Sequence, residues 1–211
     1  AHQRGAVVTV ATVPTLVSGL VSPAIKKVRQ SGQISRVRLL DGSANDVAEA
    51  VAQGDADFGL SSIPTLEPNT EFEPLFDERI VLALPRDHPL AECGSIGWDR
   101  LESTPLILPA RGTGNRLLID EAMARARRPL HWTFEVERSS TALDLVAAGM
   151  GAALVPQSAA TGTGVAIAVP TEPEIVRPIG LLVRIGQTDT LPVSALKDAI
   201  RSMANQTTPQ D

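Results

Sequence analysis

Polar side chains follow several of the apolar runs in this sequence, and together they could bind a small anion. In the first half of the chain they are hydroxyls, and in the second half hydroxyls are joined by one guanidinium and one amide. All of these groups donate hydrogen bonds, and helix N-termini favour negative charge. The residues are Thr12, Thr15, Ser43, Ser61, Ser62, Arg111, Gly112, Thr113, Asn115, Ser139, Ser140 and Thr141. As a group they predict an anion site.

Each of these residues, taken alone, has a structural explanation. Ser43 and Thr141 fit helix N-caps, and Thr12 and Thr15 fit a turn. Arg111 lies in a glycine-flanked loop and has little use as a cap, but a solvated surface arginine explains it equally well. The binding hypothesis therefore depends on the whole group.

Motifs of catalytic chemistry are incomplete in this sequence. Asp57 to Gly59 spell the magnesium-binding triplet of protein kinases, but the glycine-rich loop, the strand lysine and the His-Arg-Asp loop are missing. We expect Phe58 to be a core residue of a short strand instead. Ser194 to Lys197 spell S-x-x-K without its companion motifs, and "RGTGNR" lacks the third glycine of a dinucleotide fingerprint. No metal-ligand spacing relates the histidines, His2, His88 and His131. We expect no catalytic residue, no metal and no cofactor.

The composition narrows the possible functions. The net charge is −5 and the 19 lysines and arginines are spread along the chain, which argues against a nucleic-acid surface. The single cysteine, Cys93, excludes an internal disulfide and suggests a reducing compartment. No apolar run reaches the roughly 18 residues needed to span a bilayer, and the start carries no secretory signal. We expect a soluble, cytoplasmic protein with no membrane contact.

Apolar runs alternate with helical patterns in the first half, which is typical of an α/β chain with mostly parallel strands. Ser43 to Asp46 form an S-x-x-D capping box that opens a helix, and Gly54 ends it. Another helix, Leu16 to Gln30, is expected to kink near Pro23. Strands are predicted over Val7 to Ala11, Val37 to Leu40, Ala56 to Leu60 and Ile80 to Leu84.

The same pattern begins again in the second half. Thr141 to Asp144 form another capping box, for a helix ended by Gly149, and a further helix is expected over Arg116 to Arg127. Because Val51 to Gly54 resembles Val146 to Gly149, two related lobes are implied. Strands are predicted over Leu106 to Leu108, Phe134 to Val136, Ala152 to Val155, Val165 to Val169 and Ile179 to Arg184, and a last helix over Val193 to Met203.

Five segments, in this order, carry a resemblance to a known family. They are "VTVATVPTLVSGLVSPAIKKVR", "VRLLDGSANDVAEAVAQGDADFGL", "IVLALPRDHPLA", "STALDLVAAGMGAALVP" and "IGLLVR". Each segment is loose by itself, but their order and spacing are specific. Over roughly Gly5 to Met203, the sequence resembles the effector-binding domain of LysR-type bacterial transcriptional regulators.

The resemblance implies an α/β fold of two Rossmann-like lobes joined by two crossing strands, similar to type II periplasmic binding proteins. Lobe 1 would comprise residues 5–84 and 178–203, lobe 2 would comprise residues 85–177, and residues 204–211 would be a flexible tail. A small-molecule effector would bind in the cleft between the lobes.

The family's effector contacts come from the loop after the first strand, the cap of the next helix and facing loops of the second lobe. In this sequence, these positions correspond to Thr12, Ser43, Ser62 and either Arg111 or Ser139. They agree with the polar group found from the residues alone. The expected effector-binding residues are Thr12, Val13, Thr15, Ser43, Ser61, Ser62, Arg111, Thr113, Ser139 and Ser140.

The resemblance also implies partners. The family's N-terminal winged helix-turn-helix and linker helix are absent, so we expect a domain of a longer regulator that contacts DNA only through the missing part. Effector domains of this family pair as homodimers, and intact regulators form tetramers. We expect a non-enzymatic sensor of a small, anionic metabolite. The alternative is a free-standing solute-binding protein of a transporter, and an enzyme ranks third because no paired acid and base or activated nucleophile is visible.

Overall fold

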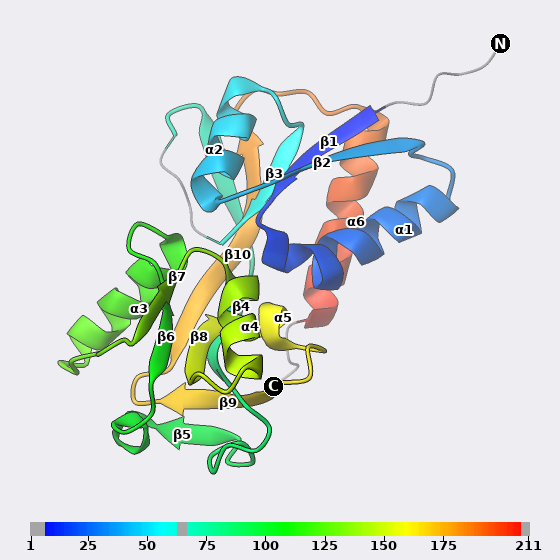
Figure 1. Cartoon of the computed structure of the whole chain (residues 1–211). Helices are drawn as coiled ribbons and strands as arrows, with labels where there is room; N and C mark the ends of the chain where they lie inside the picture. The colour runs from blue at the N-terminus through cyan, green and yellow to red at the C-terminus, as the bar shows by residue number, and fades with distance from the viewer. Residues whose placement is uncertain (1–6, 63–66, 208–211) are drawn as a thin grey trace. The chain divides into compact units, whose positions relative to one another are not determined.

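The computed structural model describes residues 7–62 and 67–207 as an α/β chain that divides into two compact units (Figure 1). Unit 1 contains the described residues up to Phe76 and those from Pro178 onward, and unit 2 is Asp77–Arg177. Strands β4 (Thr70–Leu84) and β10 (Ile175–Arg184) run from one unit into the other. The predicted α/β fold is confirmed. The chain first passes between the units inside β4, before the boundary that the sequence suggests.

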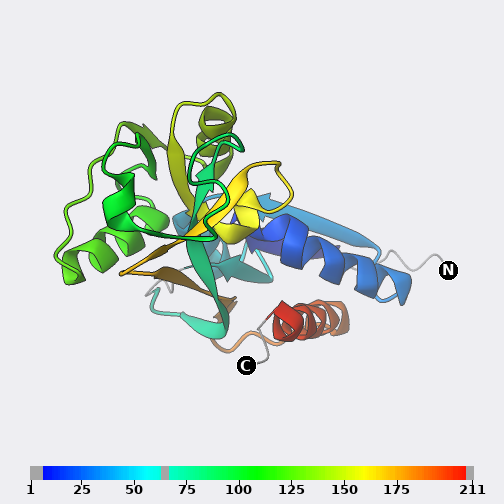
Figure 2. The same cartoon turned by 90° about the horizontal axis from the view of Figure 1, so that it is seen from below.

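Unit 1 is built on strands in the order β2-β1-β3-β10. The first three are parallel, and β10 is antiparallel to β3. Helices α1 and α6 lie side by side in both views of the ribbon (Figures 1 and 2) and contribute to one core cluster with the sheet. The elements are β1 (Val7–Thr12), α1 (Ser22–Gln30), β2 (Arg36–Asp41), α2 (Ala44–Gln53), β3 (Phe58–Ser61) and α6 (Leu191–Thr207).

The segment between β1 and α1 differs from the single kinked helix predicted over Leu16 to Gln30. Pro14–Leu16 is a turn of 3-10 helix, and Val17–Val21 is a π-helix. The irregular part therefore precedes Pro23, which lies in the first turn of α1. A proline is tolerated there because the N–H that it lacks would have no partner within the helix.

The Asp-Phe-Gly triplet is part of the core of unit 1, as the sequence predicts. Phe58 is fully buried in β3, and a Cβ on Gly59 would lie 2.7 Å from Val47 of α2, so the glycine permits close packing of helix on strand. The Asp57 carboxylate accepts a hydrogen bond from the backbone N–H of Thr9 at 2.8 Å. All three residues thus have structural roles.

Unit 2 contains strands in the order β4-β8-β6-β7, and β9 pairs with β4 and β5. Alternate residues of β4 pack on opposite faces of the sheet: Ile80 and Leu82 belong to one core cluster, and Val81 and Ala83 to another. The other elements are β5 (Ser95–Gly97), the 3-10 helix η3 (Trp98–Leu101), β6 (Leu106–Pro109), α3 (Gly114–Arg125), β7 (Phe134–Val136), α4 (Ser139–Ala147), β8 (Ala152–Pro156), α5 (Gln157–Ala160) and β9 (Ala166–Thr171).

Two predicted boundaries are wrong. β4 begins at Thr70, because a strand can carry charged residues where its side chains remain partly exposed, and the sequence indicated only its apolar end. The predicted tail, residues 204–211, is helical as far as Thr207, and Ala204 is fully buried in α6. Residues 208–211 lie outside the described residues. Within residues 7–62 and 67–207, no helix is long and apolar enough to cross a membrane.

Candidate functional site

The six predicted residues of unit 1 lie at the carboxyl ends of three parallel strands. In the sheet register, Thr12 of β1 is opposite Asp41 of β2 and Leu60 of β3. The Gly42 N–H donates to the Thr12 carbonyl and the Val13 N–H donates to the Leu60 carbonyl, both at 3.2 Å. These bonds bring together the loops that carry Thr12, Val13, Thr15, Ser43, Ser61 and Ser62.

The hydroxyls of unit 1 differ in how accessible they are. Thr12 and Ser61 are fully buried, and Ser62 is 4% exposed. The Thr12 hydroxyl donates to the Val13 carbonyl at 3.0 Å. Ser43 is exposed and Thr15 is half-buried. A ligand can thus reach Ser43 and Thr15 more easily than the other hydroxyls in this unit.

Ser43 forms the predicted capping box of α2. Its hydroxyl accepts from the Asp46 N–H at 3.2 Å, and its own N–H donates to the Asp46 carboxylate at 2.8 Å. The bond from the Ser43 N–H is the main cause that lowers the pKa of Asp46 below its ordinary value. Gly54 ends the helix in the left-handed conformation, with φ 79°.

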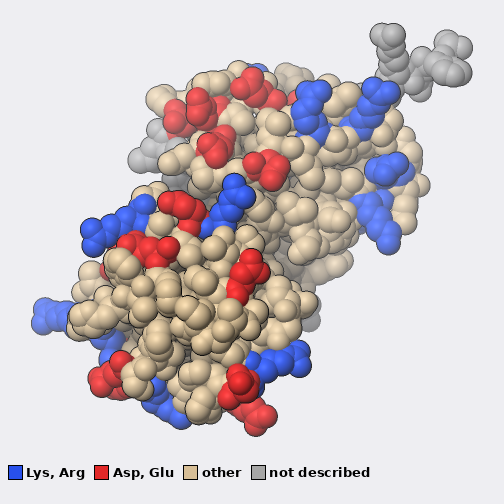
Figure 3. Space-filling view, in the orientation of Figure 1, with Lys and Arg blue, Asp and Glu red and all other residues tan. Residues whose placement is uncertain are grey.

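Charges around these loops do not favour an anion. Exposed basic side chains of unit 1 gather over α1 and β2, whereas acidic ones gather over α2 (Figure 3). Arg36 pairs with Val7 at the start of β1, far along the sheet from Thr12, while Asp41 and Asp46 flank Ser43. The basic residues are therefore less evenly spread than their positions in the sequence suggest, and they lie away from the predicted site.

The four predicted residues of unit 2 lie on two adjacent loops. Arg111 and Thr113 are in the β6–α3 loop, and Ser139 and Ser140 begin α4 after β7. β6 and β7 are parallel, and the Ala110 N–H donates to the carbonyl of Val136 at 2.8 Å. The carboxyl ends of the two strands therefore bring both loops together.

The β6–α3 loop combines a helix cap with an exposed cation. Thr113 is the N-cap of α3: its hydroxyl accepts from the Arg116 N–H at 3.3 Å and donates to the Ala110 carbonyl at 2.7 Å. The side chain of Arg111 is exposed and forms no ion pair within the described residues, while its backbone N–H donates to Glu135 at 3.3 Å. Arg111 is therefore the accessible positive charge of this loop.

The second predicted capping box is wrong. α4 begins at Ser139, its N-cap is Arg138, and no side chain caps it, so Thr141 lies within the first turn. Two residues separate β7 from α4, as two separate β2 from α2. Because both connections are two residues long, Arg138 occupies the N-cap position in unit 2 that Ser43 occupies in unit 1. Arg138 also precedes Gly149 by the same eleven residues by which Ser43 precedes Gly54, a signal that the sequence contained.

Sequence reasoning missed two buried arginines of unit 2. Arg116, 5% exposed, bonds Asp120, Glu135 and the carbonyl of Pro109. Its ion pair with Asp120, four residues along the same helix, has a spacing that the sequence could have revealed.

The other missed arginine, Arg177, is 1% exposed and pairs with Glu78 at 2.7 Å. The second Glu78 oxygen accepts from the Ser158 N–H at 2.6 Å, and Arg177 donates to the Asn115 side-chain oxygen at 3.4 Å. The amide of Asn115, a member of the predicted polar group, is thus engaged with protein. Burial lowers the pKa of the Arg177 guanidinium, and the charge of Glu78 opposes that shift. No short-range sequence pattern indicates an ion pair whose two residues are 99 positions apart.

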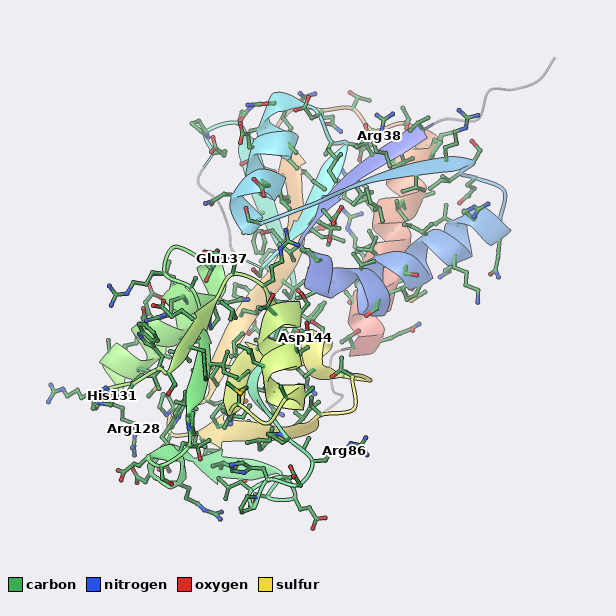
Figure 4. All side chains as sticks on the ribbon, viewed as in Figure 1. Arg38, Arg86, Arg128, His131, Glu137 and Asp144 are labelled. Atoms are coloured by element: carbon green, nitrogen blue, oxygen red, sulfur yellow. The ribbon has the colours of Figure 1, made fainter. Side chains whose placement is uncertain are left out.

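Two grooves on the described surface are lined by none of the ten predicted residues. A groove of about 370 Å³ lies on α2, and one of about 440 Å³ in unit 2 is lined by both tryptophans, Trp98 and Trp132. Arg128 and His131 also line that second groove and lie apart from Glu137, the exposed residue that follows β7 (Figure 4). Among residues 7–62 and 67–207, no group of three or more His, Cys, Asp or Glu side chains could hold a metal ion.

Comparison with known sequences points to one class of protein. The YbhD protein of Escherichia coli strain K12, an uncharacterized HTH-type transcriptional regulator, is 35% identical over 187 residues. The match covers 87% of this chain and 59% of YbhD, so the chain spans less than two thirds of that relative's length. The HTH-type regulator cbl of the same organism is 28% identical over 74% of this chain and 50% of its own.

Comparison with solved structures shows the same fold. The effector binding domain of QuiR in complex with shikimate has a TM-score of 0.83 at 20% identity, over 96% of this chain and 99% of that one. The BenM effector binding domain with its effector benzoate has a TM-score of 0.80 at 23% identity, over 96% and 95%. The family model for the LysR substrate binding domain matches residues 1–205. The chain therefore belongs to the LysR substrate-binding domain family, as the sequence predicts, and is an effector-binding domain of LysR-type regulators.

Proposed function

We propose that this domain senses a small organic anion through the ten predicted loop residues and transmits its binding to a DNA-binding part of a longer regulator. The observation that carries the proposal is the match to the LysR substrate-binding domain over residues 1–205, together with polar loops at the carboxyl ends of the strands. Ligands of open α/β sheets bind at such ends.

The chemistry of the loops supports a carboxylate as the ligand. In unit 2, the exposed Arg111 lies in the loop that precedes α3, and the hydroxyls that begin α4 are on the adjacent loop. Shikimate and benzoate, named with QuiR and BenM, are both carboxylates. Because Asp41 and Asp46 flank Ser43 in unit 1, we assign the anionic group of the ligand to Arg111.

The remaining functional expectations are part of the same proposal. The relatives reported above are transcriptional regulators, which supports a cytoplasmic, non-enzymatic role and gives no support to a transporter. We propose a homodimer of this domain, a tetramer of the intact regulator, and DNA contact only outside this chain. A ligand that binds one conformation more tightly than another shifts the population between them, which is how the signal would pass.

Thermal unfolding against a panel of carboxylates tests the proposal. A ligand that binds only the folded state adds about 2.7 kcal/mol of stability at 100 times its Kd. We expect Arg111→Ala to abolish this shift. Arg125→Ala is the matched control, because Arg125 is an exposed arginine at the last residue of α3, away from the β6–α3 loop. Retention of the full shift in Arg111→Ala would contradict the proposed site.

A further inference from the structure

We propose that Arg116 is a positioning residue that holds the β6–α3 loop, and with it Arg111, in a single conformation. The inference rests on the proposed function of that loop. Arg116 does not itself face solvent, since it is 5% exposed, so it acts through the residues that it binds.

The guanidinium of Arg116 bonds three separate elements. Its Nε donates to both carboxylate oxygens of Asp120, at 2.9 and 3.1 Å, within α3. Its Nη1 donates to the Pro109 carbonyl at the end of β6, at 3.0 Å, and to Glu135 on β7, at 2.9 Å. One side chain therefore fixes the start of the helix relative to both strands that precede the site loops.

Glu135 extends this network into the loop. The same oxygen, Oε2, that accepts from Arg116 also accepts from the backbone N–H of Arg111 at 3.3 Å. The loop is thus bonded at Pro109, at Arg111 and, through the cap, at Thr113. The Ala110 N–H also donates to the Val136 carbonyl, while the Arg111 side chain stays exposed.

Only arginine can supply these bonds at once. The acceptors lie in different directions around one planar group, and a lysine ammonium at the end of a flexible stem cannot reach Asp120, Glu135 and the Pro109 carbonyl together. Loss of stability alone does not distinguish a positioning role of Arg116 from a purely structural one, because removal of any buried cation lowers stability. Only a positioning role predicts a change that is confined to the β6–α3 loop.

Amide hydrogen exchange of the whole chain, followed by NMR, tests the inference without any ligand. In Arg116→Lys and Arg116→Met we expect exchange of the hydrogen-bonded loop amides of Arg111 and Thr113 to become about tenfold faster, because their local opening loses its restraint. Glu135→Gln keeps the shape of the side chain and gives a second variant that folds more readily, with the same pattern expected at Arg111.

The matched control is Lys197→Met in unit 1, which removes another buried cation, 7% exposed and paired with Asp189 at 2.7 Å. It should lower stability and leave the loop amides unchanged. Unchanged exchange in the Arg116 and Glu135 variants, or an equal rise throughout unit 2, would overturn the inference.

Titration with sulfate, monitored by the same amide signals, separates this inference from the proposed function. We expect sulfate to shift the signals of Gly112 and Thr113 in the natural chain, and to bind about tenfold more weakly in Arg116→Met. Equal affinity in the two chains would overturn the positioning role. If sulfate does not shift these signals in the natural chain, the proposed anion site fails, and the exchange data alone decide whether Arg116 holds the loop.

Discussion

Helices α2 and α4 begin in equivalent places of the two units, yet only α2 is capped by a side chain. At α2, Ser43 and Asp46 bond each other's backbone N–H groups. At α4, Arg138 occupies the N-cap and makes no such bond, although a T-x-x-D motif begins three residues later. A capping motif therefore works only where the connection from the preceding strand places it at the N-cap.

The difference extends to how each unit satisfies its polar groups near the site. Unit 1 uses the local and exposed Ser43–Asp46 box. Unit 2 uses buried arginines that bind partners far away in sequence as well as near, such as Glu78, which pairs with Arg177 across 99 residues. Substitutions that damage unit 2 should thus cost more than those that damage the cap in unit 1.

The largest effect is expected from Arg177→Met. It leaves the Glu78 carboxylate buried without its ion-pair partner, which costs about 3–5 kcal/mol of unfolding free energy. Urea unfolding followed by circular dichroism measures the loss. Arg79→Met is the control, because the Arg79–Glu174 pair is 53% and 43% exposed and is worth about 1 kcal/mol or less. Equal losses in the two variants would remove the distinction between buried and exposed pairs.

Ser43→Ala should have an intermediate effect. It removes the hydroxyl that accepts from the Asp46 N–H, and loss of an N-cap costs about 1 kcal/mol. The same urea titration measures it. A cost as large as that of Arg177→Met would show that Ser43 has contacts beyond the cap.

Arg138→Ser is expected to stabilise unit 2. It would give α4 the N-cap residue that α2 already has, for a gain of about 0.5–1 kcal/mol. Thermal unfolding measures the gain, and Arg138→Ala serves as the control that removes the charge without adding a cap. If serine and alanine have equal effects, the two helix starts are less alike than their connections indicate.

The contribution of Asp46 should depend on pH. Because its folded-state pKa is lowered, the stabilisation is fully present above the pKa of the unfolded chain and is lost as the pH falls through the folded value. The difference in stability between the natural chain and Asp46→Asn should therefore be larger at about pH 7 than at about pH 3. A difference that grows on acidification would contradict the capping geometry.

Thr141→Ala should have the smallest effect. Since Thr141 lies inside α4 and caps nothing, we expect a change within about 0.5 kcal/mol, in contrast to Ser43→Ala. Parallel thermal unfolding of the two variants makes the comparison. A loss of about 1 kcal/mol would instead indicate that Thr141 caps α4, as the sequence predicts.

The sequence by itself determined the α/β alternation, the family and several local features. Periodicity indicated the buried run around Phe58, and the motif at Ser43 predicted the cap and Gly54 the helix end. These features depend on residues that are close in sequence, so that a short window contains all the partners.

Tertiary structure alone decided the full length of β4 and the burial of two arginines. It also decided that the Arg111 backbone is bonded to Glu135, 24 residues away. Each of these outcomes depends on which strands pair and where their ends meet. When the partner of a residue is a carboxylate or carbonyl on another strand, the sequence around that residue does not indicate it. Only folding brings the two groups together.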